Sequence, residues 1–156
     1  MHELPPAGDE LLAEAALVIP ATVDLADGRQ AVWDALGSDR MWSWFPGIDK
    51  LRWTTDRGEG GIRELRIARA VTVREQFYRW EEPTRATFRV THASRRAING
   101  LVEDFQLEEL PGGGTRLTWT MAVDPRGPRP PRALGKLLAT GNRRLIAGIR
   151  KILTAP

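Results

Sequence analysis

The sequence predicts an α+β domain in which a seven-stranded, curved antiparallel sheet wraps around a long C-terminal helix. Three observations support this fold class. One strand is followed by two short helical segments, six more strand-like runs follow with short connectors, and the chain ends in one long amphipathic stripe. Short connectors favour antiparallel neighbours, and the last helix is the one large partner for an apolar sheet face. We therefore expect the helix to lie against the sheet.

Length and composition limit the classes of protein. The 156 residues fit one domain that can bury its own core, and the absence of cysteine excludes disulfides and thiolate chemistry. The N-terminus lacks the basic and apolar regions of a signal peptide, and nowhere do 18 apolar residues run together. We therefore expect no integral membrane segment, and a cytoplasmic location is compatible with the composition.

The first third of the chain should contain a strand and two short helices. Residues 1–14 are expected to be a flexible N-terminal segment, and 15–156 a single domain. Ala16–Leu25 alternates like a strand and ends at the turn Ala26-Asp27-Gly28. An apolar face then predicts a helix that Gly37 closes, and a second short helix should carry Met41 to Phe45 before Pro46-Gly47 ends it.

The middle of the chain reads as a series of strands. The six runs are Ile48–Thr54, Ile62–Arg69, Val71–Trp80, Arg85–Ala93, Asn99–Leu110 and Thr115–Asp124. The connectors Glu81–Thr84 and Pro111–Gly114 are typical of hairpins. After a proline-rich loop at 125–131, the final apolar stripe consists of Leu134, Leu138, Gly141, Leu145, Ile149 and Ile152.

Alternation along each strand identifies the side chains that face the helix. Successive strand residues point to opposite faces, and one of the two sets is mainly apolar. The polar members of that inward set are Arg63, Glu75, His92, Asn99 and Glu103. Buried ionised groups must pair, change protonation or meet water, and a cavity with a few polar groups on apolar walls allows all three. The apolar residues expected to line it are Leu65, Phe77, Phe88, Val90, Phe105, Trp119, Met121, Leu138 and Leu145.

These polar residues have structural explanations as well. An internal ion pair, or a position near strand ends that open to solvent, explains Arg63 and Glu75 as well as a ligand role does. His92 lies near a strand end, where a solvated histidine is more common than a catalytic one, and Glu103 is similar. Glu75, His92 and Glu103 are the candidates for acid–base catalysis, but no motif fixes their geometry, so no catalytic residue is assigned.

The residues that several other kinds of site require are absent from the sequence. His2 and His92, without any cysteine, do not make a zinc site, so no metal is expected. The glycine clusters lie in hairpin loops and match no phosphate-binding pattern. Residues 126–156 hold eight Lys or Arg and no acid, which fits the solvated face of a helix or a surface for an acidic partner. The sequence lacks the interleaved aromatic and basic residues that are typical of nucleic-acid binding.

Four motifs in this order resemble the START-like superfamily, also called SRPBCC or polyketide cyclase/dehydrase-like. They are Val32-Trp33-Asp34-Ala35-Leu36, Trp44-Phe45-Pro46-Gly47, Val73-Arg74-Glu75-Gln76-Phe77 and Gly113-Gly114-Thr115-Arg116-Leu117-Thr118-Trp119-Thr120. The resemblance covers roughly residues 15–154 and implies a helix-grip fold with a deep cavity between the sheet and the last helix. Its members bind lipids, sterols, polyketides, quinones or plant hormones, and a minority are cyclases, aromatases or dehydratases.

The leading hypothesis is therefore a protein that binds a small hydrophobic or aromatic ligand, with Arg63, Glu75, Asn99 and Trp119 orienting its polar end. The first alternative is a polyketide cyclase, aromatase or dehydratase that uses inward Glu or His as acid and base. The second is a protein-interaction module that uses the basic C-terminal helix. We expect no cofactor, a small hydrophobic ligand as the partner and no nucleic acid, and a homodimer remains an option.

Overall fold

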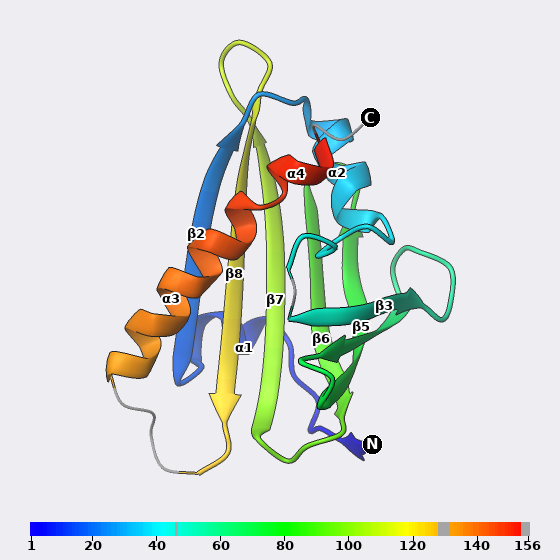
Figure 1. Cartoon of the computed structure of the whole chain (residues 1–156), viewed down its shortest axis with the longest axis vertical. Helices are drawn as coiled ribbons and strands as arrows, with labels where there is room; N and C mark the ends of the chain where they lie inside the picture. Colours follow the sequence, from blue (N-terminus) through cyan, green and yellow to red (C-terminus); the bar gives the residue numbers. More distant parts are fainter. Residues whose placement is uncertain (46, 128–131, 154–156) are drawn as a thin grey trace.

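A computed structural model describes residues 1–45, 47–127 and 132–153, without the side chains of 133, 134 and 137. The side chain of Leu134, most of the predicted proline-rich loop and the expected domain end at 156 thus lie outside what the structure describes. The seven predicted strands form one antiparallel sheet in the order β2-β8-β7-β6-β5-β4-β3. Their bounds are Leu17–Leu25 (β2), Ile48–Trp53 (β3), Ile62–Ile67 (β4), Val71–Glu81 (β5), Arg85–Ala93 (β6), Ile98–Glu109 (β7) and Thr115–Pro125 (β8). The sheet curves around helices on its concave side (Figure 1), so the predicted fold class is confirmed.

The helices on the concave side are α2 (Arg29–Gly37), α3 (Arg132–Ala147) and α4 (Arg150–Leu153). The predicted single C-terminal helix is thus two helices. Helix α3 lies along the edge strand β2 (Figure 1), and the Asn142 side-chain amide donates a hydrogen bond to the Ile19 carbonyl oxygen over 3.1 Å. No helix in the described part of the chain is long and apolar enough to cross a membrane.

The second short helix expected after α2 is a series of turns. Backbone hydrogen bonds run from Met41 to Ser38 and from Phe45 to Trp42, each spanning three residues. Trp42 has a φ of 67°, a left-handed conformation that an α-helix cannot continue through. This backbone places the indole of Trp42 in the core, where it is 3% exposed.

The N-terminal segment contains strand β1 (His2–Glu3) and helix α1 (Asp9–Glu14). Both lie outside the concave side: α1 contacts β7 and β8, and β1 pairs with the end of β6. Val102 and Ala122, on the convex face of the sheet, are fully buried. Because α1 contacts the strands that carry them, their apolar surface is removed from water by the N-terminal segment.

Strand β1 occupies a gap in the sheet. Strand β6 pairs with β7 only over Arg85–Arg89, so its last residues lack β7 as a neighbour. The backbone of His2–Glu3 pairs there with His92 and Ala93, and the Leu4 N–H donates to the Thr91 carbonyl oxygen over 2.8 Å. These contacts satisfy backbone groups that the separation of the strands would otherwise leave open.

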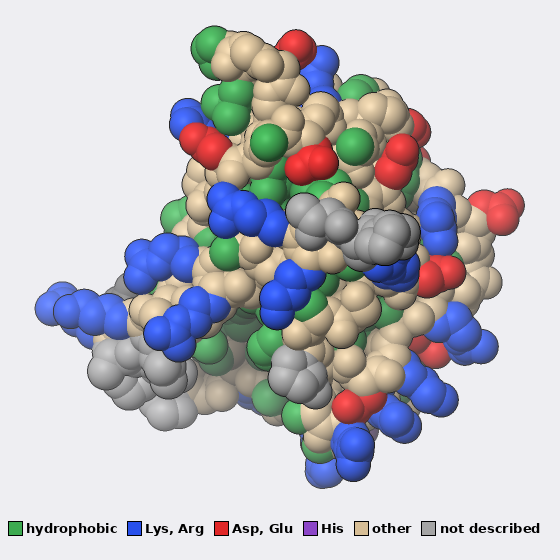
Figure 2. Space-filling model, turned by 45° about the horizontal axis from the view of Figure 1, so that its top comes forward, with side chains coloured by type: hydrophobic (Ala, Val, Ile, Leu, Met, Phe, Trp, Pro, Cys, Tyr) green, Lys and Arg blue, Asp and Glu red, His purple; other side chains and the backbone are tan. Residues whose placement is uncertain are grey.

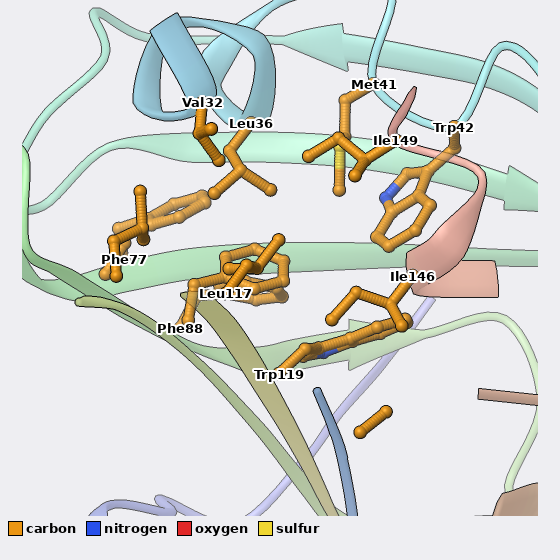
Figure 3. Close-up of a cluster of buried hydrophobic side chains, with 14 of the residues drawn as sticks. Val32, Leu36, Met41, Trp42, Phe77, Phe88, Leu117, Trp119, Ile146 and Ile149 are labelled. Atoms are coloured by element: carbon orange, nitrogen blue, oxygen red, sulfur yellow. The ribbon is translucent and has the colours of Figure 1, made fainter. Parts of the chain in front are cut away.

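The half of the concave face beneath α2, which we call the closed half, is tightly packed. Figure 3 shows that side chains from α2, from the turns after it, from α3 and from the turn between α3 and α4 point at the sheet: Val32, Leu36, Met41, Trp42, Ile146 and Ile149 meet Phe77, Phe88, Leu117 and Trp119. The ring centroids of Trp42 and Trp119 are 4.8 Å apart. A cavity of only about 10 Å³ remains near Trp33 and Phe105, room for at most one water molecule.

The break between α3 and α4 brings the turns against the helix. The Trp44 indole N–H donates to the Leu145 carbonyl oxygen over 3.2 Å, and a Cβ at Gly148 would overlap that indole. We expect Gly148→Ala to lower the free energy of unfolding by about 1–3 kcal/mol, because the turns must separate from the helix. Urea denaturation measures this change.

Gly141, in the middle of α3, provides the matched control. A Cβ there would meet no atom within 4 Å, so Gly141→Ala should stabilise the protein by about 0.5–1 kcal/mol through helix propensity alone. Equal effects of the two substitutions would contradict this packing.

Candidate ligand site in the concave face

The other half of the concave face, which we call the open half, is incompletely covered. Its hydrophobic residues are only partly buried although they pack against the core: Ile48, Ile67, Val71, Leu101, Met121 and Leu145. Ile48 and Val71 are both opposite Ile67 in the register, and Leu101 and Met121 lie on the same concave face of the sheet, on β7 and β8. Figure 2 shows a hollow beside a group of Lys and Arg side chains, with hydrophobic side chains on its walls. An apolar hollow of this kind is a candidate ligand site.

A buried ion pair lies on the same face. Arg63 on β4 and Glu75 on β5 are opposite each other in the register, and the Arg63 Nε donates to a Glu75 carboxylate oxygen over 2.5 Å. The two side chains are only 1% and 5% exposed. The guanidinium carbon is 4.9 Å from the ring centre of Phe77 and 4.6 Å from that of Phe88. The cation is thus held by one carboxylate and two aromatic rings.

Glu103 is a second inward carboxyl group and lies next to the hollow. It is opposite the partly exposed Met121 in the register, and Leu101 lies two residues earlier on the same face. The Trp119 indole N–H donates to one of its oxygens over 2.8 Å. Among the described residues, its other oxygen has no hydrogen-bond partner.

Burial chiefly raises the pKa of Glu103, to about 8, and the negative charge of Glu75 raises it further. The charge of Arg63 and the hydrogen bond from Trp119 act in the opposite direction. Near neutral pH the group is therefore mostly a neutral carboxylic acid. A protonated carboxyl beside an apolar hollow can donate a hydrogen bond or a proton.

The residues predicted to line a cavity fall into two groups. Leu65, Phe77, Phe88, Val90, Phe105 and Trp119 are buried in the core, most of them in the closed half. Met121 and Leu145 are only partly buried and adjoin the hollow, whereas Leu138 is 38% exposed. The predicted lining therefore overlaps the hollow at its edge, and the sequence analysis omitted Ile48, Ile67, Val71 and Leu101 from the site. Only their place in the inward-facing set of each strand, or their position along the strand, could have indicated that these residues line the hollow.

The inward orientation predicted for His92 and Asn99 is wrong, and β-bulges explain both errors. In β6 the register shifts at Thr91, so His92 lies opposite Arg74 on the convex face. In β7 the register shifts between Ile98 and Gly100, and Asn99 is exposed near the N-terminal segment. A bulge adds one residue to a strand and reverses the alternation beyond it. Neither residue belongs to the hollow.

The sequence analysis also missed a buried acid on the convex face. Asp104 is 1% exposed and accepts hydrogen bonds from Thr87, Arg85 and Gln106 over 2.6, 2.9 and 2.6 Å. These partners satisfy it, so we assign it a structural role. Within the described residues, no group of three His, Asp or Glu side chains could hold a metal ion.

The pKa of Glu103 makes its contribution to stability dependent on pH. The unfolded chain releases this proton near pH 4.5, whereas the folded protein keeps it to about pH 8, so stability falls as the pH rises between these values. We expect Glu103→Gln to raise the free energy of unfolding by about 2–4 kcal/mol at pH 9 and by less than about 1 kcal/mol at pH 4. Urea denaturation at both pH values checks this, and a difference that does not depend on pH would contradict it.

Comparison with known proteins agrees with this architecture. The family described as "Polyketide cyclase / dehydrase and lipid transport" matches residues 18–153. Uncharacterised proteins of Mycobacterium tuberculosis (H37Rv) and Mycobacterium bovis are each 34% identical over 139 residues, covering 86% of this chain and 83% of theirs.

Solved structures share the fold at low sequence identity. A START superfamily protein from Mycobacterium smegmatis aligns with a TM-score of 0.69 at 16% identity, covering 85% of this chain and 92% of that one. A Thermus thermophilus protein gives 0.70 at 14%, covering 87% and 96%. Ara h 8.0201 gives 0.68 at 12%, with the same coverage. With its curled sheet and C-terminal helix, this chain belongs to the START-like family of polyketide cyclase/dehydrase and lipid-transport proteins.

Proposed function

We propose that this protein binds a small hydrophobic or aromatic ligand in the hollow of the open half. One observation carries the proposal: partly exposed apolar walls adjoin a buried carboxyl group whose second oxygen lacks a partner among the described residues. The ligand would rest its apolar body on Leu101, Met121 and Val71, and its polar end would face Glu103. The family to which the chain belongs is compatible with this role.

The energetics favour a mainly apolar ligand. Removing apolar surface from water contributes roughly 25 cal/mol per Å², and the exposed walls of the hollow gain this energy together with the ligand. Part of it offsets the loss of the ligand's translational and rotational freedom. One hydrogen bond to Glu103 would add orientation more than affinity, as in most small-molecule sites.

Binding can be tested with a neutral fluorescent probe such as 1-aminoanthracene. We expect saturable binding, and we expect Met121→Trp to weaken it at least about tenfold, because the larger ring occupies the hollow. Fluorescence titration measures both affinities. Native mass spectrometry of the purified protein should also detect a co-purified apolar molecule.

Val18→Trp serves as the control, because Val18 is 40% exposed on the convex side of β2. This variant should bind the probe like the unchanged protein. Equal weakening by the two tryptophans, or no binding to the unchanged protein, would count against the hollow as the site.

A second candidate function is acid–base catalysis of the cyclase or dehydratase type. The raised pKa of Glu103 favours it, since a carboxyl that titrates near neutrality can both donate and accept a proton. Glu75 is less suited because its carboxyl group is already paired with Arg63, and His92 faces the convex side.

If this second function holds, Glu103→Gln should reduce turnover of a model polyketone at least about 100-fold while the fold is kept. Glu108→Gln, an exposed residue on the same strand, should leave turnover unchanged. Mass spectrometry of the product measures turnover. Full activity of Glu103→Gln would show that Glu103 does not act as the acid or base.

A further inference from the structure

On the concave face of the sheet, the inward ionisable side chains include more carboxyl groups than cations. Arg63, Glu75 and Glu103 face the same side of the sheet, which gives two carboxyl groups and one cation. Strands β6 and β8 present apolar residues and Trp119 to Glu103, and α3 turns the cations Lys136, Arg143 and Arg144 to solvent. Glu75 and Arg63 are thus the charged side chains of the described residues that act on Glu103.

Arg63 is not available to a ligand anion. Its charge is balanced by Glu75, its side chain is 1% exposed, and the rings of Phe77 and Phe88 pack against the guanidinium. An anion at this position would have to displace Glu75 and leave that carboxylate buried without a partner. Such a buried, unpaired charge is strongly unfavourable.

Glu103 has the opposite character. One of its oxygens already accepts the Trp119 N–H, and the other has no partner within the described part of the chain. As a neutral acid it can donate one hydrogen bond through that oxygen, and a carbonyl or ether oxygen of a ligand can accept it. A ligand carboxylate would lose its hydration in the hollow without gaining a cation, because Arg63 is already paired with Glu75, and above the pKa of Glu103 repulsion between like charges adds to this cost.

We propose that the hollow selects uncharged ligands that carry an acceptor oxygen, such as aromatic ketones, and rejects carboxylates of the same shape. This inference rests on the proposed function and specifies its class of ligand. It assigns Glu103 as the residue that determines specificity, with the Arg63–Glu75 pair removing the one inward cation of the described residues from competition.

Three naphthalenes of nearly equal shape test the inference: 2-acetonaphthone, 2-naphthoate and 2-ethylnaphthalene. Equilibrium dialysis against the whole protein at pH 6 should give an affinity for the ketone at least about tenfold above that for the carboxylate. The hydrocarbon should bind more weakly than the ketone, because it accepts no hydrogen bond. At pH 9.5 the advantage of the ketone over the hydrocarbon should disappear as Glu103 ionises.

Glu103→Gln distinguishes charge from shape. Its amide donates at every pH, so the affinity for the ketone should no longer change between pH 6 and pH 9.5. At pH 9.5 the variant should also bind naphthoate more tightly than the unchanged protein does. Glu108→Gln, exposed on the same strand, should behave like the unchanged protein, and circular dichroism verifies the fold of each variant.

The outcomes separate the two proposals. Naphthoate binding as tightly as acetonaphthone at pH 6, or the same pH dependence in Glu103→Gln, would overturn the selection of uncharged ligands while the binding function stands. If none of the three probes binds and 1-aminoanthracene does not bind either, the proposed function fails and this inference fails with it.

Discussion

The burial of three ionisable side chains on an apolar sheet face is the constraint on which the rest of the concave side depends. Arg63 and Glu75 solve the problem by pairing, over 2.5 Å and between aromatic rings. Glu103 has no cation of its own among the described residues, and burial raises its pKa to about 8, so it remains largely protonated. The two solutions lie on one face of one sheet. Arg63 and Glu75 satisfy each other, whereas one oxygen of Glu103 has no hydrogen-bond partner among the described residues.

The position of these groups coincides with the boundary between the two halves of the concave face. On one side, Trp42, Ile146 and Ile149 fill the space over the aromatic strands and leave almost no cavity. On the other side, hydrophobic side chains stay partly exposed around the hollow. Unfilled apolar surface costs stability, and a ligand would recover that cost. The difference in packing between the halves is therefore the main structural argument for a binding site.

Sequence reasoning recovered the strands and most of the inward side chains, because hydrophobic alternation is a property of each strand alone. It placed Arg63, Glu75 and Glu103 on the same face, as the register does. It failed for His92 and Asn99, since a bulge depends on how two strands pair and leaves no local mark in the chain. It could not divide the lining between core and hollow either, because coverage by Trp42 depends on a left-handed backbone at that residue.

The convex side explains how the sheet tolerates an open concave half. Helix α1 buries Val102 and Ala122, and Asp9 accepts hydrogen bonds from Tyr78 and Arg79 over 2.9 and 2.6 Å. The Arg79 guanidinium holds the pKa of Asp9 below its ordinary value, so this contact persists over the neutral range. Helix α1 thus covers the convex face of β7 and β8 at Val102 and Ala122, directly behind the part of these strands that carries Leu101 and Met121. This support from behind accompanies the partial burial of Leu101 and Met121 on the concave face of the same two strands.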